Sequence, residues 1–317
     1  MKITLYKNFK IKKKHKNSIL LIGNFDGLHL GHQKLFKLAK TYKREKKLKI
    51  GVITFNPIPK MFFNKKLKNF RISNFNQQIN FFKKYDVDFV ILKKFNKEFS
   101  RVKYDKFISR ILFTNLKTKY IFVSNNFRFG YKREGDVRLL KRYQSICNYN
   151  LINPKPLTKN NKIVSSTLIR NFLSLGKLNR ANFLLNRNWS MEGIVRKGRM
   201  MGRKIGFPTA NINLNNYILP ALGVYAVRAH LGNSKKSLRG VANIGYRPTF
   251  KQKKILLEVN LFNFNKIIYN KKLTVEFLKF IRKEKKFNGI KELIKQIKID
   301  LIKAKKFKET KYEQRKY

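Results

Sequence analysis

The chain is poor in cysteine, in acidic residues and in long apolar runs. Its single cysteine, Cys147, excludes an intramolecular disulfide and a zinc cluster built on thiolates, and it fits the reducing cytoplasm. No apolar run approaches the roughly 18 to 20 residues of a membrane-spanning helix, and the first residues lack the apolar core of a signal peptide. We therefore expect a cytoplasmic protein without a membrane partner.

Acidic residues number only 16 against 75 lysines and arginines, which gives a formal net charge of +59. Such an excess is typical of proteins that bind nucleic acids or anionic membranes. The basic residues, however, are scattered along the whole chain, and Asn, Ile and Phe are abundant with them, as expected when a genome drifts toward A/T-rich codons. We therefore expect no specific nucleic-acid partner, and non-specific binding of polyanions stays open.

The 317 residues exceed the usual length of a single domain, so two domains are expected. In the first half, short apolar runs rich in β-branched and aromatic residues alternate with segments of helical periodicity. This alternation predicts a Rossmann-like, doubly wound α/β domain, whose parallel sheet binds ligands beyond the carboxyl ends of its strands. The expected strands are residues 18–23, 49–55, 87–92 and 119–123.

The second half has apolar runs without helical segments between them, which predicts a small antiparallel β-barrel. A terminal α-helix should follow, because apolar residues recur at helical spacing from Ile290 to Leu301. The pattern changes near residues 184–193, so we expect one domain over 1–186 and another over 187–317. The expected barrel strands are residues 223–231, 238–245, 255–264 and 273–281.

Two of the four histidines, His29 and His32, lie three residues apart in "IGNFDGLHLGHQKLF" (22–36). The stretch is typical of a strand end, a glycine-rich loop and the start of a helix, where unpaired N–H groups and the helix dipole favour anions. Imidazoles there could donate to phosphate oxygens and stabilise charge that develops during transfer. A zinc site is disfavoured because no nearby cysteine or carboxylate pattern completes it, whereas two incidental histidines remain an alternative.

Hydroxyl side chains precede another helical segment in "VSSTLIR" (164–170). Ser165, Ser166 and Thr167 could cap that helix while its N–H groups bind phosphate, and Arg170 could add a fixed cation. A plain helix cap with an exposed arginine explains the same residues equally well.

Two features of the second half point to phosphoryl transfer. In "GRMMGRKIGFPTANI" (198–212), an extended stretch after Pro208 would place Thr209 and Asn211 on one face, and two neutral oxygens suit a partly hydrated magnesium ion. Strand alternation places Glu258 on the face opposite to its apolar neighbours, where a carboxylate could take the proton of a hydroxyl nucleophile. By themselves these residues also fit a glycine-rich turn and an ordinary exposed strand glutamate.

The G-x-F-D-G-x-H-x-G-H pattern of residues 23–32 resembles the signature of the nucleotidylyltransferase superfamily as it occurs in prokaryotic bifunctional riboflavin kinase/FAD synthetases. Seven further stretches resemble that family in order and spacing, and together they extend over residues 1 to about 306. In the first half these are residues 54–63, 125–136 and 164–170; in the second, which resembles the riboflavin kinase module, they are 198–211, 240–250, 257–264 and 273–287.

The resemblance implies riboflavin, FMN and ATP as small-molecule substrates, Mg²⁺ as cofactor, and FMN and FAD as products. It implies catalytic roles for His29, His32 and Arg170 in adenylylation and for Glu258 as the base of the kinase step. The implied ATP site of the adenylyltransferase is Gly23, Phe25, Asp26, Gly27, His29, Gly31, His32, Ser166, Thr167 and Arg170, and its FMN side is Pro57, Asn126 and Phe127. The implied ATP site of the kinase is Gly198, Gly202, Gly206, Pro208, Thr209 and Asn211, with Mg²⁺ at Thr209 and Asn211.

The chain departs from the family in its first half. Relatives commonly read T-F-E-P-H-P where this chain has Asn56 and Ile58, and their third motif often begins Gly-Glu/Ala-Asp/Asn where this chain has Ser124, Asn125 and Asn126. An enzyme that retains only the kinase step is therefore one alternative, and a basic nucleic-acid-binding protein on the same scaffold is another. We expect a monomer or a weak homo-oligomer.

Overall fold

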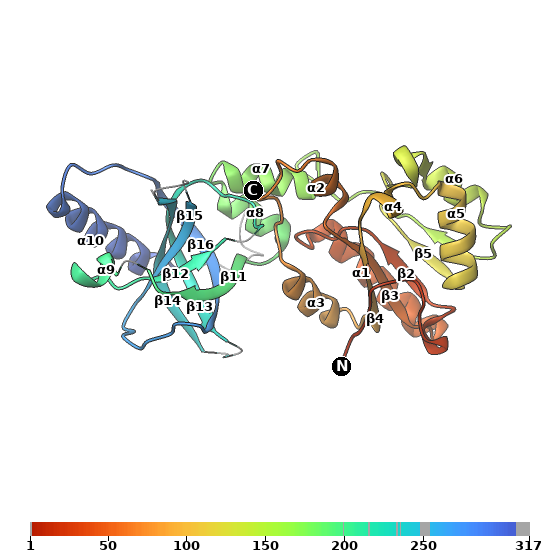
Figure 1. The fold of residues 1–317 in the computed structure, drawn as a ribbon, viewed down its shortest axis with the longest axis horizontal. Coiled ribbons are helices and arrows are strands. Elements are labelled where there is room, and N and C mark those ends of the chain that lie inside the picture. Colours follow the sequence, from red (N-terminus) through yellow and green to blue (C-terminus); the bar gives the residue numbers. More distant parts are fainter. Residues whose placement is uncertain are drawn as a thin grey trace. The chain divides into compact units, whose positions relative to one another are not determined.

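The structure is a computed structural model that describes residues 2–198, 200–214, 216–232, 234, 236–247 and 254–308; residues 248–250 of one predicted motif lie outside the described residues. The chain divides into two units, Met1–Lys68 with Phe75–Val164, and Asn69–Asn74 with Ser165–Tyr317. The second unit thus begins before residue 187, the predicted start of the second domain, and it includes a short segment from the first half of the chain. Figure 1 follows the elements of both units in chain order.

The first unit is built on a six-stranded sheet in the order β1-β4-β3-β2-β5-β8, and every strand pair in it is parallel. The four predicted strands correspond to β2 through β5, so the predicted parallel sheet is confirmed. The edge strands β1 and β8, of three residues each, were not predicted from the sequence. The strands are β1 (Thr4–Tyr6), β2 (Ile19–Ile22), β3 (Ile50–Asn56), β4 (Phe89–Lys94), β5 (Tyr120–Phe122) and β8 (Asn150–Ile152).

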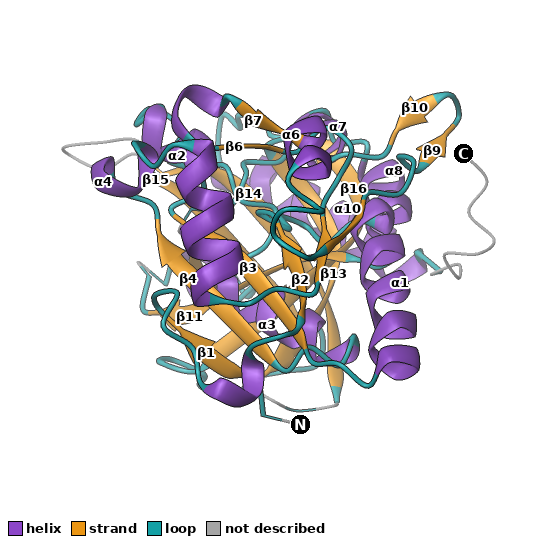
Figure 2. Cartoon of the chain, turned by 90° about the vertical axis from the view of Figure 1, so that its right-hand side faces the viewer, coloured by secondary structure: helices purple, strands orange, loops and turns teal. Residues whose placement is uncertain are grey.

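Helices cover both faces of this sheet. Successive strand residues point to opposite sides, so neighbouring residues of β2 pack against different helices. Ile19 of β2 belongs to the same buried cluster as Phe36 of α1 (Leu30–Lys46), which Figure 2 shows beside the strands. Leu20, the next residue, belongs to the cluster of Ile108 from the π-helix Phe107–Asn115. The smaller elements are α2 (Pro59–Phe63), α3 (Phe75–Lys84), α4 (Lys97–Ser100), α5 (Tyr104–Lys106), α6 (Val137–Arg142), β6 (Arg128–Phe129), β7 (Gly135–Asp136), β9 (Thr158–Lys159), β10 (Lys162–Ile163) and the 3₁₀ turns Lys13–His15 and Tyr131–Arg133.

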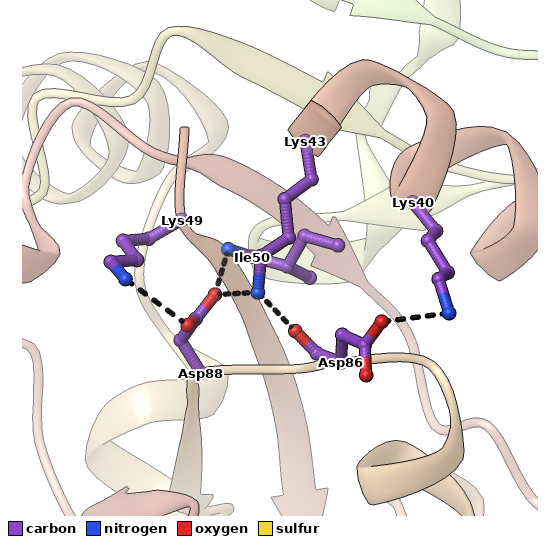
Figure 3. A network of polar contacts seen from close by, with 6 residues as sticks. All are labelled: Lys40, Lys43, Lys49, Ile50, Asp86 and Asp88. Atoms are coloured by element: carbon purple, nitrogen blue, oxygen red, sulfur yellow. Dashed lines mark hydrogen bonds and ion pairs between the residues drawn. The ribbon is translucent and has the colours of Figure 1, made fainter. Parts of the chain in front are cut away.

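A buried carboxylate joins the amino ends of two central strands (Figure 3). Asp88, 5% exposed, precedes β4, and its Oδ2 accepts hydrogen bonds from Lys43 Nζ at 2.7 Å and from the Ile50 N–H at 2.8 Å. Lys49 Nζ lies 3.6 Å from Oδ1, and Lys43 Nζ also donates to the Asp86 carbonyl at 2.6 Å. Since ligands bind at the opposite, carboxyl edge of such a sheet, this network stabilises the fold.

Asp88→Asn is expected to lower the free energy of unfolding by about 2 to 3 kcal/mol, because it leaves the partly buried Lys43 ammonium without its carboxylate. The loss stays below that of a fully enclosed pair since the Lys49 side chain is 54% exposed. Urea unfolding measures the change. Asp86→Asn is the matched control: its pair with Lys40 joins side chains that are 44% and 53% exposed, so it should cost about 0.5 kcal/mol. Equal losses in the two variants would contradict the prediction.

The second unit contains a closed antiparallel barrel in the strand order β11-β12-β15-β14-β13-β16, which confirms the predicted barrel. The predicted runs correspond to β13 through β16, and β12 corresponds to the extended stretch considered after Pro208, whereas β11 was not predicted. The strands are β11 (Trp189–Arg196), β12 (Ala210–Asn213), β13 (Gly223–Leu231), β14 (Ser237–Arg247), β15 (Lys254–Leu261) and β16 (Lys272–Lys283). The helices are α7 (Ser166–Ser174), α8 (Leu178–Leu185), α9 (Met201–Lys204) and α10 (Ile290–Lys306).

The predicted terminal helix is confirmed as α10, which lies along the outside of the barrel (Figure 1). Its Asp300, 2% exposed, accepts hydrogen bonds from Nε and Nη2 of Arg282 in β16, at 2.9 and 2.7 Å. This two-point ion pair holds the helix to the barrel wall. Within the described part of the chain, no helix combines the length and hydrophobicity that a membrane crossing requires.

Candidate active sites

The order of the parallel sheet changes direction at β2. The chain adds β3 and β4 on one side of β2 and then places β5 on the other side. The loops that follow β2, β3 and β5 carry His29, Pro57 and Asn126, and all three leave the carboxyl edge of adjacent strands. Ligands of doubly wound sheets bind at such a switch point, so the sheet brings these three predicted residues to one edge.

The loop between β2 and α1 adopts an uncommon backbone. Phe25 and Leu28 both have φ near +46°, in the left-handed region, and Gly27 has φ +77°. For residues other than glycine this conformation costs about 1 to 2 kcal/mol, and it is concentrated at functional sites. Asp26, between them, is 2% exposed and so belongs to the loop's interior.

Two buried glutamines, which the sequence did not single out, support this loop from below. Gln78 Nε2 of α3 donates to the carbonyls of Asn24 and Phe25 at 3.0 and 3.2 Å. Gln33 Nε2 of α1 donates to the Leu28 carbonyl at 3.0 Å. A signal was present: both are amide side chains on helix faces that are otherwise apolar.

His29 is the N-cap residue of α1. Its Nδ1 accepts a hydrogen bond from the His32 N–H at 3.4 Å, so the neutral ring carries its proton on Nε2. The two imidazoles stack, with ring centroids 3.7 Å apart and planes inclined by 20°. The ring of Phe25 contacts His32 edge-on at 5.3 Å. The helix N-terminus therefore presents a fixed imidazole pair where anions are favoured.

Two glycines make room for these rings. A Cβ built on Gly31 would lie 3.2 Å from the His29 ring, and one built on Gly23 would lie 3.1 Å from the Phe25 ring. Both distances are below ordinary van der Waals contact, so a side chain at either position would displace a ring of the pair or its neighbour.

The predicted FMN-binding residues lie in the loops after β3 and β5. Asn126 is exposed, and its Oδ1 accepts a hydrogen bond from Ser124 Oγ at 2.9 Å. Phe127 stacks on Phe129 with ring centroids 5.5 Å apart. Pro57 follows β3 through a cis peptide bond. The stretch from Asn125 onward contains the short β6–β7 hairpin.

The hairpin ends in a capped helix. Asp136 caps α6 by accepting from the Leu139 N–H at 2.9 Å, and it pairs with Arg138 and Arg128 at 3.1 and 3.4 Å. The backbone hydrogen bond from Leu139 and then the neighbouring guanidinium of Arg138 hold the pKa of this carboxyl below its usual range. Asp136 therefore stays ionised and fixes the loop's geometry.

The helix start with the hydroxyl side chains Ser165, Ser166 and Thr167 belongs to the second unit. Ser165 is the N-cap of α7, because its Oγ accepts from the Leu168 N–H at 3.3 Å. Ser166 and Thr167 occupy the first turn, and Arg170 follows one turn later. Ser165 is therefore the capping residue, and Ser166 and Arg170, four residues apart, lie on one face of the helix.

In the barrel, strand register gathers the predicted kinase residues on the outer face. Asn211 of β12 is paired with Glu258 of β15, and Glu258 is paired with Asn243 of β14. Directly paired residues point to the same side of a sheet with Cβ atoms about 4.5 to 5.5 Å apart. The neighbouring Leu257, 0% exposed, points into the barrel, whereas Glu258 is partly exposed. Asn243 is an addition that only the register reveals.

Asn211 is 7% exposed, and among the described residues no hydrogen-bond partner reaches its Oδ1. The glycine-rich loop lies directly against it: a Cβ on Gly198 would be 2.4 Å from Asn211 Nδ2. A Cβ on Gly202 would be 2.4 Å from the Phe207 carbonyl oxygen and 3.5 Å from Thr209 Oγ1. A buried oxygen without a protein partner fits a metal ligand.

The rest of the loop is also anchored to the barrel. Asn260 Nδ2 of β15 donates to the Pro208 carbonyl at 2.8 Å, and Gly206 has φ +86°. Thr209 comes immediately before β12, so the loop delivers it next to Asn211. Among the described residues, no three His, Cys, Asp or Glu side chains gather as a metal-binding group.

Comparisons with known proteins follow the same division. The FAD synthetase family matches residues 11–168, and the riboflavin kinase family matches residues 185–308. A bifunctional riboflavin kinase/FMN adenylyltransferase from Buchnera aphidicola subsp. Acyrthosiphon pisum is 40% identical over 299 residues, which cover 94% of this chain and 95% of that protein. The chain belongs to the bifunctional riboflavin kinase/FMN adenylyltransferase family.

Other relatives agree with this membership. The bifunctional riboflavin kinase/FMN adenylyltransferase from Bacillus subtilis is 37% identical, and the alignment covers 92% of each chain. Among solved structures, a crystal structure described as a macrolide-efflux protein from Streptococcus pneumoniae has a TM-score of 0.86 and 29% identity, covering 96% of this chain and 99% of that one. The similarity to members of the bifunctional family therefore extends over nearly the whole chain.

Proposed function

We propose that the two activities of the family reside at the two sites described above. The chain phosphorylates riboflavin to FMN with ATP and then adenylylates FMN to FAD with release of pyrophosphate. The observation that carries this conclusion is that both families match, in order, over nearly the whole chain. Small-molecule substrates are therefore riboflavin, FMN and ATP.

In the kinase step, Glu258 takes the proton of the ribityl 5′-hydroxyl, whose oxygen attacks the γ-phosphorus of ATP. A new P–O bond forms, the bond between the γ-phosphorus and the β,γ-bridging oxygen breaks, and ADP leaves. Gly198, Gly202 and Gly206 let the loop lie close to the nucleotide, and Thr209 and Asn211 face its phosphates. Positioning and charge stabilisation supply most of the catalysis in such transfers.

We assign Mg²⁺ to Thr209 and Asn211, supported by the buried Asn211 Oδ1. When bound, the ion would neutralise charge on the ATP phosphates. Asn211→Leu preserves the side-chain shape but removes Oδ1, so it should lower the kinase rate about tenfold or more and raise the Mg²⁺ concentration for half-maximal rate. Asn213→Leu, on the same face of β12, is the control and should change neither quantity. Identical responses of the two variants would contradict the assignment.

In the adenylylation step, a phosphate oxygen of FMN attacks the α-phosphorus of ATP, the bond to the bridging oxygen breaks, and pyrophosphate leaves. The proton on Nε2 of His29 and the neighbouring His32 stabilise the charge that develops on the phosphates. Ser166, Thr167 and Arg170 on α7 are the second phosphate-binding element. Pro57, Asn126 and Phe127 contact FMN.

The test is a flavin assay on the purified chain with ATP and Mg²⁺. Riboflavin should yield FMN and then FAD, and added FMN should yield FAD and pyrophosphate. Failure to make FMN would remove the kinase claim. Conversion of riboflavin to FMN without any FAD would show that only the kinase step is retained, which the departures at Asn56 and Ile58 kept open.

The net charge of +59 motivates a second experiment. We propose a cytoplasmic monomer or weak homo-oligomer without a specific nucleic-acid partner, so its binding to double-stranded DNA should be independent of sequence. A protein that contacts six or more phosphates should lose about 10³-fold in affinity between roughly 50 and 200 mM salt. Fluorescence anisotropy with two unrelated duplexes measures both properties. Sequence-selective binding that persists at the higher salt would favour a nucleic-acid-binding function.

A further inference from the structure

Arg170 is held at two points by one aromatic residue. Its guanidinium carbon lies 3.7 Å from the ring centroid of Phe70, and its Nε donates to the Phe70 carbonyl at 2.8 Å. Phe70 is 8% exposed, whereas Arg170 is partly exposed. Because the ring fixes the plane of the guanidinium and the carbonyl fixes its Nε edge, the direction of the two terminal amino groups is fixed as well.

Phe70 belongs to a short stretch, residues 69–74, that we call the anchor segment. It derives from the first half of the chain but is part of the second unit. The N–H groups of Phe70 and Arg71 donate to the Asn216 carbonyl at 3.0 and 2.8 Å, and the Ile218 N–H donates to the Arg71 carbonyl at 2.7 Å. The backbone on both sides of the Phe70 carbonyl is therefore tied down.

A buried indole completes the support. Trp189 of β11 is 1% exposed, and its Nε1 donates to the Ile72 carbonyl at 2.9 Å. Asn74 Nδ2 donates to Glu192 Oε2 of the same strand at 3.2 Å. The first barrel strand thus positions the anchor segment, and the anchor segment positions Arg170.

A guanidinium is costly to immobilise, because a free arginine side chain has about 2 kcal/mol of rotamer entropy to lose. Because the Arg170 side chain is already ordered before a ligand binds, less conformational entropy is lost on binding. This favours recognition of a planar or tetrahedral anion. The same face of α7 carries Ser166, in the first turn, where a phosphate is favoured. A partly exposed arginine, ordered next to a helix start, is prepared to contact a ligand.

We propose that Phe70 is a positioning residue for FMN adenylylation, which orients Arg170 toward the ATP phosphates. This inference rests on the proposed role of Arg170 in that reaction. Phe70 itself adds no charge and contacts no reacting atom. Its contribution is to the fraction of Arg170 side chains that point in the productive direction before ATP binds.

Two substitutions separate the ring from the rest of Phe70. Phe70→Leu retains the carbonyl and most of the apolar volume but removes the ring face, so kcat/KM for ATP in adenylylation should fall about tenfold. Phe70→Tyr retains the ring face and should keep the wild-type value. The riboflavin kinase activity of the same full-length protein is the internal control and should be unchanged in both variants.

A double-mutant cycle with Arg170→Lys identifies the residue through which Phe70 acts. The lysine keeps the positive charge but has no planar group to stack, so Phe70→Leu should add no further loss in that background. The inference would be overturned if the loss in the double variant were the product of the two single losses. Equal impairment by Phe70→Leu and Phe70→Tyr, or a parallel loss of kinase activity, would also overturn it. A wild-type protein that makes FMN but no FAD would instead refute the proposed adenylylation itself.

Discussion

Glu258→Gln should lower the rate of FMN formation by about 10²- to 10⁴-fold while FAD formation from added FMN stays unchanged. The substitution keeps the size of the side chain and its place between Asn211 and Asn243 but removes the carboxylate that we propose accepts the hydroxyl proton. The partly exposed, outward-facing position makes a large stability loss unexpected. Initial rates of both steps, with the flavins separated by chromatography, measure the effect.

The matched control is Glu276→Gln in β16, the same chemical change on another strand of the barrel. Glu276 lies 3.7 Å from Arg228 and 3.5 Å from His230, contacts that serve the barrel itself. We expect this variant to keep its kinase rate. If the two variants had similar kinase rates, Glu258 would not be the base, and an ordinary strand glutamate would be the better interpretation.

His29→Asn should lower the rate of FMN adenylylation by about 10²- to 10³-fold, the usual loss when one donor to a developing charge is removed. Asparagine is a favourable N-cap residue, so the start of α1 should be retained. What disappears is the imidazole, including its Nε2 proton and its stacking on His32. The variant therefore separates the proposed catalytic role of His29 from its observed role as a helix cap.

Two measurements complete this experiment. The urea unfolding midpoint and the kinase rate should both match those of the unchanged protein, because capping is preserved and the barrel is untouched. An unchanged rate of FAD formation would show that His29 serves only as a helix cap. A loss of adenylylation that accompanies a lowered unfolding midpoint would assign the effect to the fold.

The sequence predicts best where burial is continuous. The strands β2 to β5 are short apolar runs, and their pattern predicts a parallel sheet because both faces must be covered. β11 was not predicted: its Glu192, whose side chain is only 8% exposed, has its partners Lys272 and Asn74 in distant parts of the chain. Buried and less buried residues alternate only from Trp189 to Glu192, because Gly193 and the exposed Ile194 interrupt the pattern.

The site residues show the same limit. The sequence motif predicted the loop that carries His29. The role of His29 as a helix cap depends on where α1 begins, and this role determines which ring nitrogen carries the proton. Gln78 supports that loop from a helix more than fifty positions away. Phe70 lies 100 positions before Arg170, so no spacing rule relates the two. Contacts at such separation are properties of the fold and not of any local stretch.

The anchor segment also determines how the chain can be divided. The chain passes between the two units at three places: after Lys68, after Asn74 and after Val164. No single cut therefore sorts the polypeptide into its two units, and a cut at the predicted boundary after residue 186 would divide the second unit itself. A cut between the two family matches, residues 11–168 and 185–308, would keep residues 69–74 with the FAD synthetase match but would part them from Trp189 and Asn216, which hold them in place.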